Sequence, residues 1–229
     1  FEESRDRFIE SAKIITRSLD DGVLEGDGPF YRIPRTLLRP RPDRTFRDRT
    51  YGAAISPDTY AIHAELGIGL IITIQKPWDV IGGDVETHRR VFREKHGADA
   101  PAPILGAFVV CDRDGSRAKE TAHRYMGSYY HSVIEHYDLG GTQFKGTKGY
   151  DYYDNMASKI RRYGEDTSRF FADLQIWGTP DECAEKIAFA REKTGCREFI
   201  AIFDMAELPF EESERSLKLF ASDVMPRLR

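Results

Sequence analysis

The sequence has few of the features that mark metal sites, secreted scaffolds and membrane proteins. Its 229 residues include only three cysteines, Cys111, Cys183 and Cys196, whose spacing matches neither a zinc site nor a disulfide framework. No apolar run approaches the ~20 residues that a membrane-spanning helix needs, and no signal peptide is recognisable. We therefore expect three small buried cysteines in a cytoplasmic protein that binds no metal and contacts no membrane.

Charge patterning argues against a nucleic-acid partner. The net charge is −4, and acidic and basic residues are interspersed along the chain. The run 35–49 is locally basic, and it can be read as a solvated loop or edge hairpin or as a phosphate-tracking patch. Its prolines favour the first reading. The six histidines lack the spacing of a metal site and are expected at the surface or at helix ends. A Ser-His-Asp elbow, a Walker loop and a G-x-G-x-x-G fingerprint are also missing from the sequence.

Hydrophobic patterning predicts strands that alternate with helices. A helical stripe spans 3–19, and 30–42 is typical of a short hairpin-like excursion. Four short apolar runs then lie at 50–54, 69–74, 104–111 and 199–203, and the helical patterns lie at 57–66, 84–96, 114–137, 180–194 and 211–224. Continuous apolar strands that alternate with helices indicate βαβ units and a parallel sheet buried on both faces.

Two helix starts carry clear N-terminal signals. "TPDE" at 179–182 is a capping box with proline at the first helical position, and "SPDT" at 56–59 repeats the N-cap and the proline. Gly67 and Gly195 follow the expected ends of the same helices. These helix starts support the alternation of strands with helices.

The region 112–177 is too long for one crossover. An insertion of this kind after a strand usually covers the carboxyl end of the sheet as a lid or substrate wall. Four parallel strands with their helices form half of a (β/α)₈ barrel, so the chain is either an open four-stranded α/β protein or part of a barrel. It begins at Phe1 inside a helical pattern, and we expect residues before Phe1 in the native protein. We treat 1–229 as a single domain.

Several stretches together resemble the bacterial-luciferase-like flavin-dependent monooxygenases. They are "ESRDRFIESAKII", "YRIPRTLLRPRP", "YGAAISPDTYAIHAELGIGLIITIQKPW", "IEHYDL", "KGYDYYDNMA", "WGTPDECAEKI" and "LKLFASDVMPRL", in this order along almost the whole chain. The resemblance implies a (β/α)₈ TIM barrel, of which this chain supplies about the last four βα units plus an insertion after the third of its strands.

The resemblance also implies a cofactor site at the turn "AAISPDT", which in the family holds the phosphate of flavin mononucleotide (FMN). The first amides of a helix lack intrahelical partners, and the helix dipole favours an anion there. The implied cofactor-binding residues are Arg5, Ala53, Ala54, Ile55, Ser56, Thr59 and Ile74. Ser56 could instead be a plain N-cap, Arg5 could pair with Glu2 or Glu3, and Ile74 could belong to the core.

Other residues are candidates for a substrate pocket or for catalysis. Gln75, Tyr150 and Trp177 are expected near the mouth of the barrel, and His136 with Tyr137 is a weak catalytic candidate. The alternative is that His136 and Tyr137 fasten the insertion to the barrel. The resemblance implies that most of the histidines and other groups that the family uses near the flavin ring lie in a first half of the barrel that precedes this chain.

The resemblance implies a flavin-dependent monooxygenase that uses reduced FMN and dioxygen to oxygenate a small organic substrate. Two alternatives remain: a non-catalytic flavin-binding relative of luciferase, and an oxidoreductase that uses the deazaflavin F420 on the same barrel. A flavin reductase and a second copy of the chain are the expected partners, in addition to the small-molecule substrate.

Overall fold

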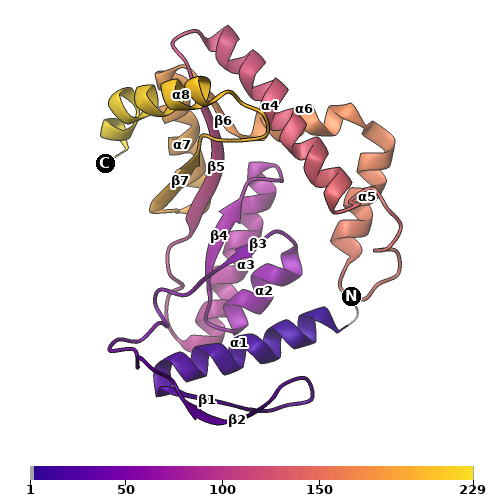
Figure 1. Cartoon of the computed structure of the whole chain (residues 1–229), viewed down its shortest axis with the longest axis vertical. Coiled ribbons are helices and arrows are strands. Elements are labelled where there is room, and N and C mark those ends of the chain that lie inside the picture. The colour runs from indigo at the N-terminus through magenta and orange to yellow at the C-terminus, as the bar shows by residue number, and fades with distance from the viewer. Residues whose placement is uncertain (1–2, 229) are drawn as a thin grey trace.

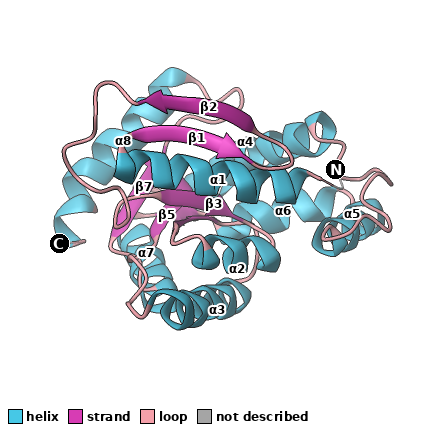
Figure 2. Cartoon of the chain, turned by 90° about the horizontal axis from the view of Figure 1, so that it is seen from below, coloured by secondary structure: helices cyan, strands magenta, loops and turns pink. Residues whose placement is uncertain are grey.

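The computed structural model describes residues 3–228, apart from the side chain of Glu165. The chain opens with α1 (Ser4–Asp21), followed by an antiparallel hairpin of β1 (Val23–Asp27) and β2 (Arg32–Leu37). The predicted hairpin at 30–42 lies too far along the chain, because its first strand is 23–27. The basic run 35–49 is partly in β2 and otherwise loop. Figure 2 shows α1 between this hairpin and the main sheet.

The main sheet consists of parallel strands with β5 at its centre. Its members are β3 (Tyr51–Ala54), β4 (Gly69–Thr73), β5 (Ile104–Cys111), β6 (Ile176–Gly178) and β7 (Glu198–Ile202). Residues 104–106 of β5 pair with β4, residues 104–108 pair with β7, and residues 109–111 pair with β6. The four predicted strands and the parallel sheet are therefore confirmed.

The fifth strand, β6, was missed by the sequence analysis. It is only three residues long, so its apolar pattern is too short to recognise, and its first two residues fall inside the expected insertion 112–177. Gln175 fixes its place, because this side chain accepts a hydrogen bond from the Phe108 amide at 3.2 Å and donates one to the Ile74 carbonyl at 2.8 Å. The β6 strand therefore starts close to the end of β4.

Helices cover one face of this sheet (Figure 1). They are α2 (Pro57–Glu65), α3 (Trp78–His96), α7 (Pro180–Thr194) and α8 (Phe210–Asp223), with a short 3₁₀ turn, η1 (Met225–Arg227), at the end. The main core includes Leu70, Ile72, Leu105, Val109 and Ile187. On the opposite face of β7, Ile200 and Ile202 remain 48% and 37% exposed. The strands thus form an open, curved part of a barrel, buried mainly from its helical side.

Two helices differ from the predictions. The α3 helix begins at Trp78 and not at 84, and Gly82 explains the difference. Glycine lowers helix propensity, but the Cβ position of Gly82 lies 3.3 Å from the Lys193 carbonyl, so a side chain there would crowd α7. In α1 the sequence predicts an apolar stripe that includes Ala12 and Ile15. Ile14 is buried and Ile15 is 54% exposed, because the side that packs on the hairpin is rotated from that stripe.

The insertion consists of α4 (Gly115–His136), α5 (Asp151–Tyr163) and α6 (Glu165–Leu174). It has its own apolar cluster, in which the rings of Tyr130 and Phe171 stack at 4.5 Å. The segment before α5 returns to the start of α1, where the Tyr150 hydroxyl lies 2.7 Å from the Ser4 hydroxyl. Within residues 3–228, no helix is long and apolar enough to cross a membrane. The three cysteines are buried and free, as predicted.

Candidate functional site

The turn between β3 and α2 presents its hydroxyl groups without using them as helix caps. Ser56 occupies the N-cap position in extended conformation, and Pro57 follows at the first helical position. The Ser56 hydroxyl accepts no hydrogen bond from the helix amides and instead contacts the Thr59 hydroxyl at 2.8 Å. The plain N-cap reading of Ser56 therefore does not describe this turn. The two hydroxyls keep capacity for a further partner, since each carries one donor and two acceptor positions.

Arg5 brings a positive charge to the same turn from the first turn of α1. Its Nη1 donates to the Asp58 carboxylate at 2.6 Å, and its Nη2 donates to the Gly149 carbonyl of the insertion. The pairing with Glu3 does not occur, because Glu3 binds Arg7 at 2.9 Å, and Glu2 lies outside the described residues. The starts of α1 and α2 are thus adjacent.

A cavity of about 290 Å³ lies between these two helix starts. Ser4, Arg5, Ser56, Thr59 and Tyr150 supply its polar lining. Ala53, Phe8, Ile62, His63 and Tyr153 complete it. The volume is near the lower end of the ~300–1,000 Å³ typical of ligand pockets. It suits the tail of a ligand better than a whole cofactor.

His63 is the feature of this cavity that the sequence analysis missed. Histidines were expected at the surface or at helix ends, and His63 lies in the last turn of α2 but is only 3% exposed. Within residues 3–228, its Nδ1 is buried and has no hydrogen-bond partner. Burial, and next the nearby His88, lowers the pKa of His63 to about 4, so the imidazole is neutral in the free protein. The spacing of four residues from Thr59 placed both on one face of α2 and could have drawn attention to it.

Lys76 supports the turn from the end of β4. Its ammonium forms an ion pair with Asp84, and both side chains are largely buried. It also donates to the Ile55 carbonyl at 2.6 Å, and it lies 5.1 Å and 5.3 Å from the ring centroids of Tyr60 and Tyr152. This single cation therefore ties together β4, the turn before α2 and the first turn of α5.

The remaining predicted residues do not line the cavity. Ala54 and Ile74 are buried in the main core, and Gln75 is half-buried beside the end of β4. Trp177 lies in β6, where its indole Nε1 donates to the Ala172 carbonyl at 2.8 Å and the Lys186 ammonium sits 3.6 Å from its ring centroid.

The weak catalytic pair lies elsewhere in the fold. His136 and Tyr137 are exposed at the end of α4, and the Tyr137 side chain is 70% exposed. The structure brings together Arg5, Ala53, Ser56, Thr59 and Tyr150 around one cavity, while His136 and Tyr137 remain apart from it.

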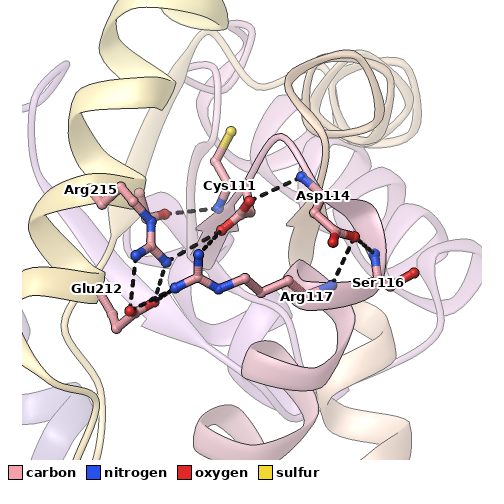
Figure 3. A network of polar contacts seen from close by, with 8 residues as sticks. Cys111, Asp114, Ser116, Arg117, Glu212 and Arg215 are labelled. Atoms are coloured by element: carbon pink, nitrogen blue, oxygen red, sulfur yellow. Dashed lines mark hydrogen bonds and ion pairs between the residues drawn. The ribbon is translucent and has the colours of Figure 1, made fainter.

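A second polar cluster lies at the carboxyl end of β5 (Figure 3). Two arginines, Arg117 and Arg215, are shared between the carboxylates of Asp112 and Glu212. Arg117 donates to both Glu212 oxygens, at 2.8 Å and 3.0 Å. The Arg215 guanidinium, followed by Arg117, lowers the pKa of Glu212. This cluster joins α4 to α8. Its two cations face two anions, so none of these four charges is left unpaired for a ligand.

These features define an α/β protein of the (β/α)-barrel type, with a donor-rich cavity where its strands end and its helices begin. The profile of the family described as luciferase-like monooxygenase matches residues 1–198. The chain belongs to that family. The predicted family and fold class are confirmed, and the structure adds β6 to the expected strands.

Curated relatives agree with this assignment. The chain is 25% identical over 226 residues to the alkanal monooxygenase alpha chain of Photorhabdus luminescens, an alignment that covers 95% of this chain and 61% of that protein. A second alkanal monooxygenase alpha chain, from the Kryptophanaron alfredi symbiont, is 24% identical over 225 residues, with 94% and 61% covered. The chain thus spans about three fifths of the length of the curated relatives it matches.

Solved structures share the fold at lower identity. Monooxygenase RslO1 from Streptomyces bottropensis has a TM-score of 0.66 and 20% identity, covering 100% of this chain and 63% of that one. An F420-dependent secondary alcohol dehydrogenase has a TM-score of 0.65 and 16% identity, with 98% and 62% covered. The oxygenating constituent of 3,6-diketocamphane monooxygenase from Pseudomonas putida, in complex with FMN, has a TM-score of 0.60 and 15% identity, with 97% and 62% covered.

Proposed function

We propose that this chain is part of a flavin-dependent monooxygenase and that the cavity between α1 and α2 holds the phosphate of FMN. The observation that carries the proposal is the position of Arg5, whose guanidinium reaches the first turn of α2 at 2.6 Å from Asp58. A helix start attracts anions through its unpaired amides and its dipole. A guanidinium beside it adds charge-assisted hydrogen bonds.

The residues present fit a phosphate group. Arg5, Ser56 and Thr59 supply donors, and the buried Nδ1 of His63 lacks a partner in the described part of the chain. Asp58 opposes an anion, but its side chain is 58% exposed. An exposed ion pair contributes only about 0–1 kcal/mol, so a phosphate can replace the Asp58 carboxylate on Arg5 at small cost. The backbone of Ala53 and Ile55 would run beside the cofactor.

Reduced FMN, when bound, supplies the oxygen chemistry. The residues of this chain bind its tail, orient it and shield it. Tyr150 and Tyr153 of the insertion line one side of the cavity. Burial raises the pKa of Tyr153, so this phenol is neutral at physiological pH. A small organic substrate, a flavin reductase as the source of reduced FMN, and a homodimer complete the proposal.

A second cofactor has specific support. An F420-dependent alcohol dehydrogenase has almost the same TM-score as the first monooxygenase, 0.65 against 0.66, so an F420-dependent oxidoreductase is the alternative. A non-catalytic flavin-binding protein is the third reading, and it would keep the cavity without the oxidation.

Binding measurements test the cavity. FMN, riboflavin and F420 are titrated into the protein by calorimetry, together with the variants Arg5→Ala and Ser56→Ala. We expect FMN to bind more tightly than riboflavin, and each variant to lose about tenfold in FMN affinity, since a hydrogen bond to a charged group contributes about 1.5–3 kcal/mol. Riboflavin affinity should not change. Arg7→Ala is the matched control, because Arg7 pairs with Glu3 on the same helix.

The outcomes separate the three readings. Equal affinities for FMN and riboflavin, or full FMN affinity in both variants, reject the phosphate site. Preference for F420 with no uptake of dioxygen supports the deazaflavin enzyme. FMN binding with no oxygenated product across a panel of small substrates, and with no dioxygen consumption beyond that of free reduced FMN, supports the non-catalytic reading.

A further inference from the structure

His63 has three properties that its packing in the fold does not explain. It lines the cavity that contains Arg5 and Thr59, it is 97% buried (3% exposed), and its Nδ1 has no partner within the described residues. A buried polar group without a hydrogen bond costs about 1–3 kcal/mol. Of the buried side-chain polar atoms in residues 3–228, only this one and the Thr73 hydroxyl are left without a partner.

The imidazole is held in one position by packing from two sides. The ring lies 5.7 Å from the ring of Phe8 on α1. On β3 it lies against Gly52, where an added Cβ would be 2.6 Å from the His63 Cε1. Only glycine at position 52 leaves room for the ring. The imidazole is thus closely packed, while its Nδ1 has no hydrogen-bond partner among the described residues.

We propose that His63 is a further ligand-binding residue of the cavity, which takes up a proton and donates a hydrogen bond to the phosphate when an anionic cofactor tail enters. This inference rests on the proposed phosphate site. On this proposal, His63 becomes a second positive charge in the cavity only when the ligand binds, whereas the charge of Arg5 is permanent.

The charged and titratable groups around His63 explain why the proton is absent beforehand. His88 on α3 opposes a positive charge on His63. Arg5 on α1 lines the same cavity, and Asp58 on the helix of His63 is committed to Arg5. Tyr153 on α5 also lines the cavity and is neutral because burial raises its pKa. Burial alone already favours the neutral ring. A bound phosphate reverses this balance, because an anion next to the ring favours the imidazolium.

The sign of the pH dependence follows from this linkage. The pKa of His63 is about 4 in the free protein and higher in the complex, so binding takes up a proton between these two values. FMN affinity therefore falls as the pH rises through the pKa of the complex. The phosphate of free FMN has its own second pKa near 6, and the titration of the free ligand is the same in experiments with the wild type and with a His63 variant.

Calorimetry in buffers of different ionisation enthalpy measures the protons taken up on binding. Wild type, His63→Asn and His63→Phe are titrated with FMN and with riboflavin at about pH 5.5 and about pH 8.5. We expect the wild type to take up more protons than either variant at the lower pH. The variants should lose about tenfold in FMN affinity there and about threefold at the higher pH, where only a neutral hydrogen bond is lost. Riboflavin binding should be unaffected.

Controls keep this test independent of folding and of the proposed function. His131→Gln changes an exposed histidine on α4 and should match the wild type. If the variants do not fold, the His63 ring signals of the wild type in NMR, titrated with and without FMN, still report the pKa shift. Equal proton uptake in wild type and variants, or an unshifted His63 pKa, overturns the inference. If Arg5→Ala still weakens FMN binding in that case, the phosphate site stands and only the role of His63 is rejected.

Discussion

Two polar clusters lie where strands of the sheet end, and they differ in what remains unpaired. The cluster after β5 has two arginines and two carboxylates that satisfy one another (Figure 3). The cavity before α2 has an arginine on an exposed carboxylate, two hydroxyls that contact each other, and a histidine Nδ1 without a partner in the described chain. The number of charges is greater in the first cluster, but the unused donors are in the second. Unmet hydrogen-bonding capacity is the better indicator of a binding site.

The largest effect should come from Lys76, which supports the cavity from behind. Lys76→Met leaves Asp84 buried without its partner and removes the donor to the Ile55 carbonyl. Breaking a buried ion pair costs ~3–5 kcal/mol, so we expect a loss of that size in the free energy of unfolding, measured by denaturant titration, together with weaker FMN binding.

The matched control is Lys193→Met, which removes an ion pair with the mostly exposed Asp79. That loss should stay below about 1 kcal/mol. Equal effects of the two substitutions would show that Lys76 is not specially required.

A smaller effect, on FMN affinity, should distinguish the cavity from the paired cluster after β5. Asp58→Asn frees Arg5 and removes a negative charge from the cavity entrance. FMN affinity should therefore rise by about threefold to tenfold at low ionic strength and by less at high ionic strength. Asp112→Asn acts in the paired cluster and should leave FMN affinity unchanged. Calorimetric titrations at two salt concentrations measure both, and a loss of affinity in Asp58→Asn would contradict the placement of the phosphate.

The smallest effect should be the response of the paired cluster to acid. Arg215 and Arg117 lower the pKa of Glu212 below its usual 4.5, so the carboxylate adds stability above that pH. This contribution is lost as the pH falls through the lowered value in the folded state. Glu212→Gln should reduce the free energy of unfolding by about 1 kcal/mol or less at neutral pH, and by less as the pH drops below 4. A constant difference across pH 3–7 would argue against the pairing.

Local signals made the turn at 53–59 predictable. Ser56, Pro57 and Thr59 mark a strand end and a helix start within seven residues, and no distant contact is needed to recognise them. The resemblance supplied Arg5. By contrast, the burial of His63 depends on Phe8 and Gly52 from two other elements, and its spacing from Thr59 indicates only the face of the helix on which it lies.

Tertiary packing explains the other differences between sequence and structure. The sequence analysis did not single out Lys76, whose carboxylate partner Asp84 lies on a helix that was predicted to begin only at 84. Strand β6 has three residues, and its position depends on Gln175. The apolar runs that form β3, β4, β5 and β7 were read correctly, whereas the hairpin strand β1 and the three-residue strand β6 were missed.

Gly149 links the insertion to the cavity in a way that restricts how the loop can be altered. Its backbone has a φ of +79°, and an added Cβ would lie 2.5 Å from the Arg5 Nη1. Its carbonyl also accepts from the same guanidinium. This arrangement restricts loop exchanges between relatives in this segment. They must retain glycine here, or the graft will displace the arginine along with the loop.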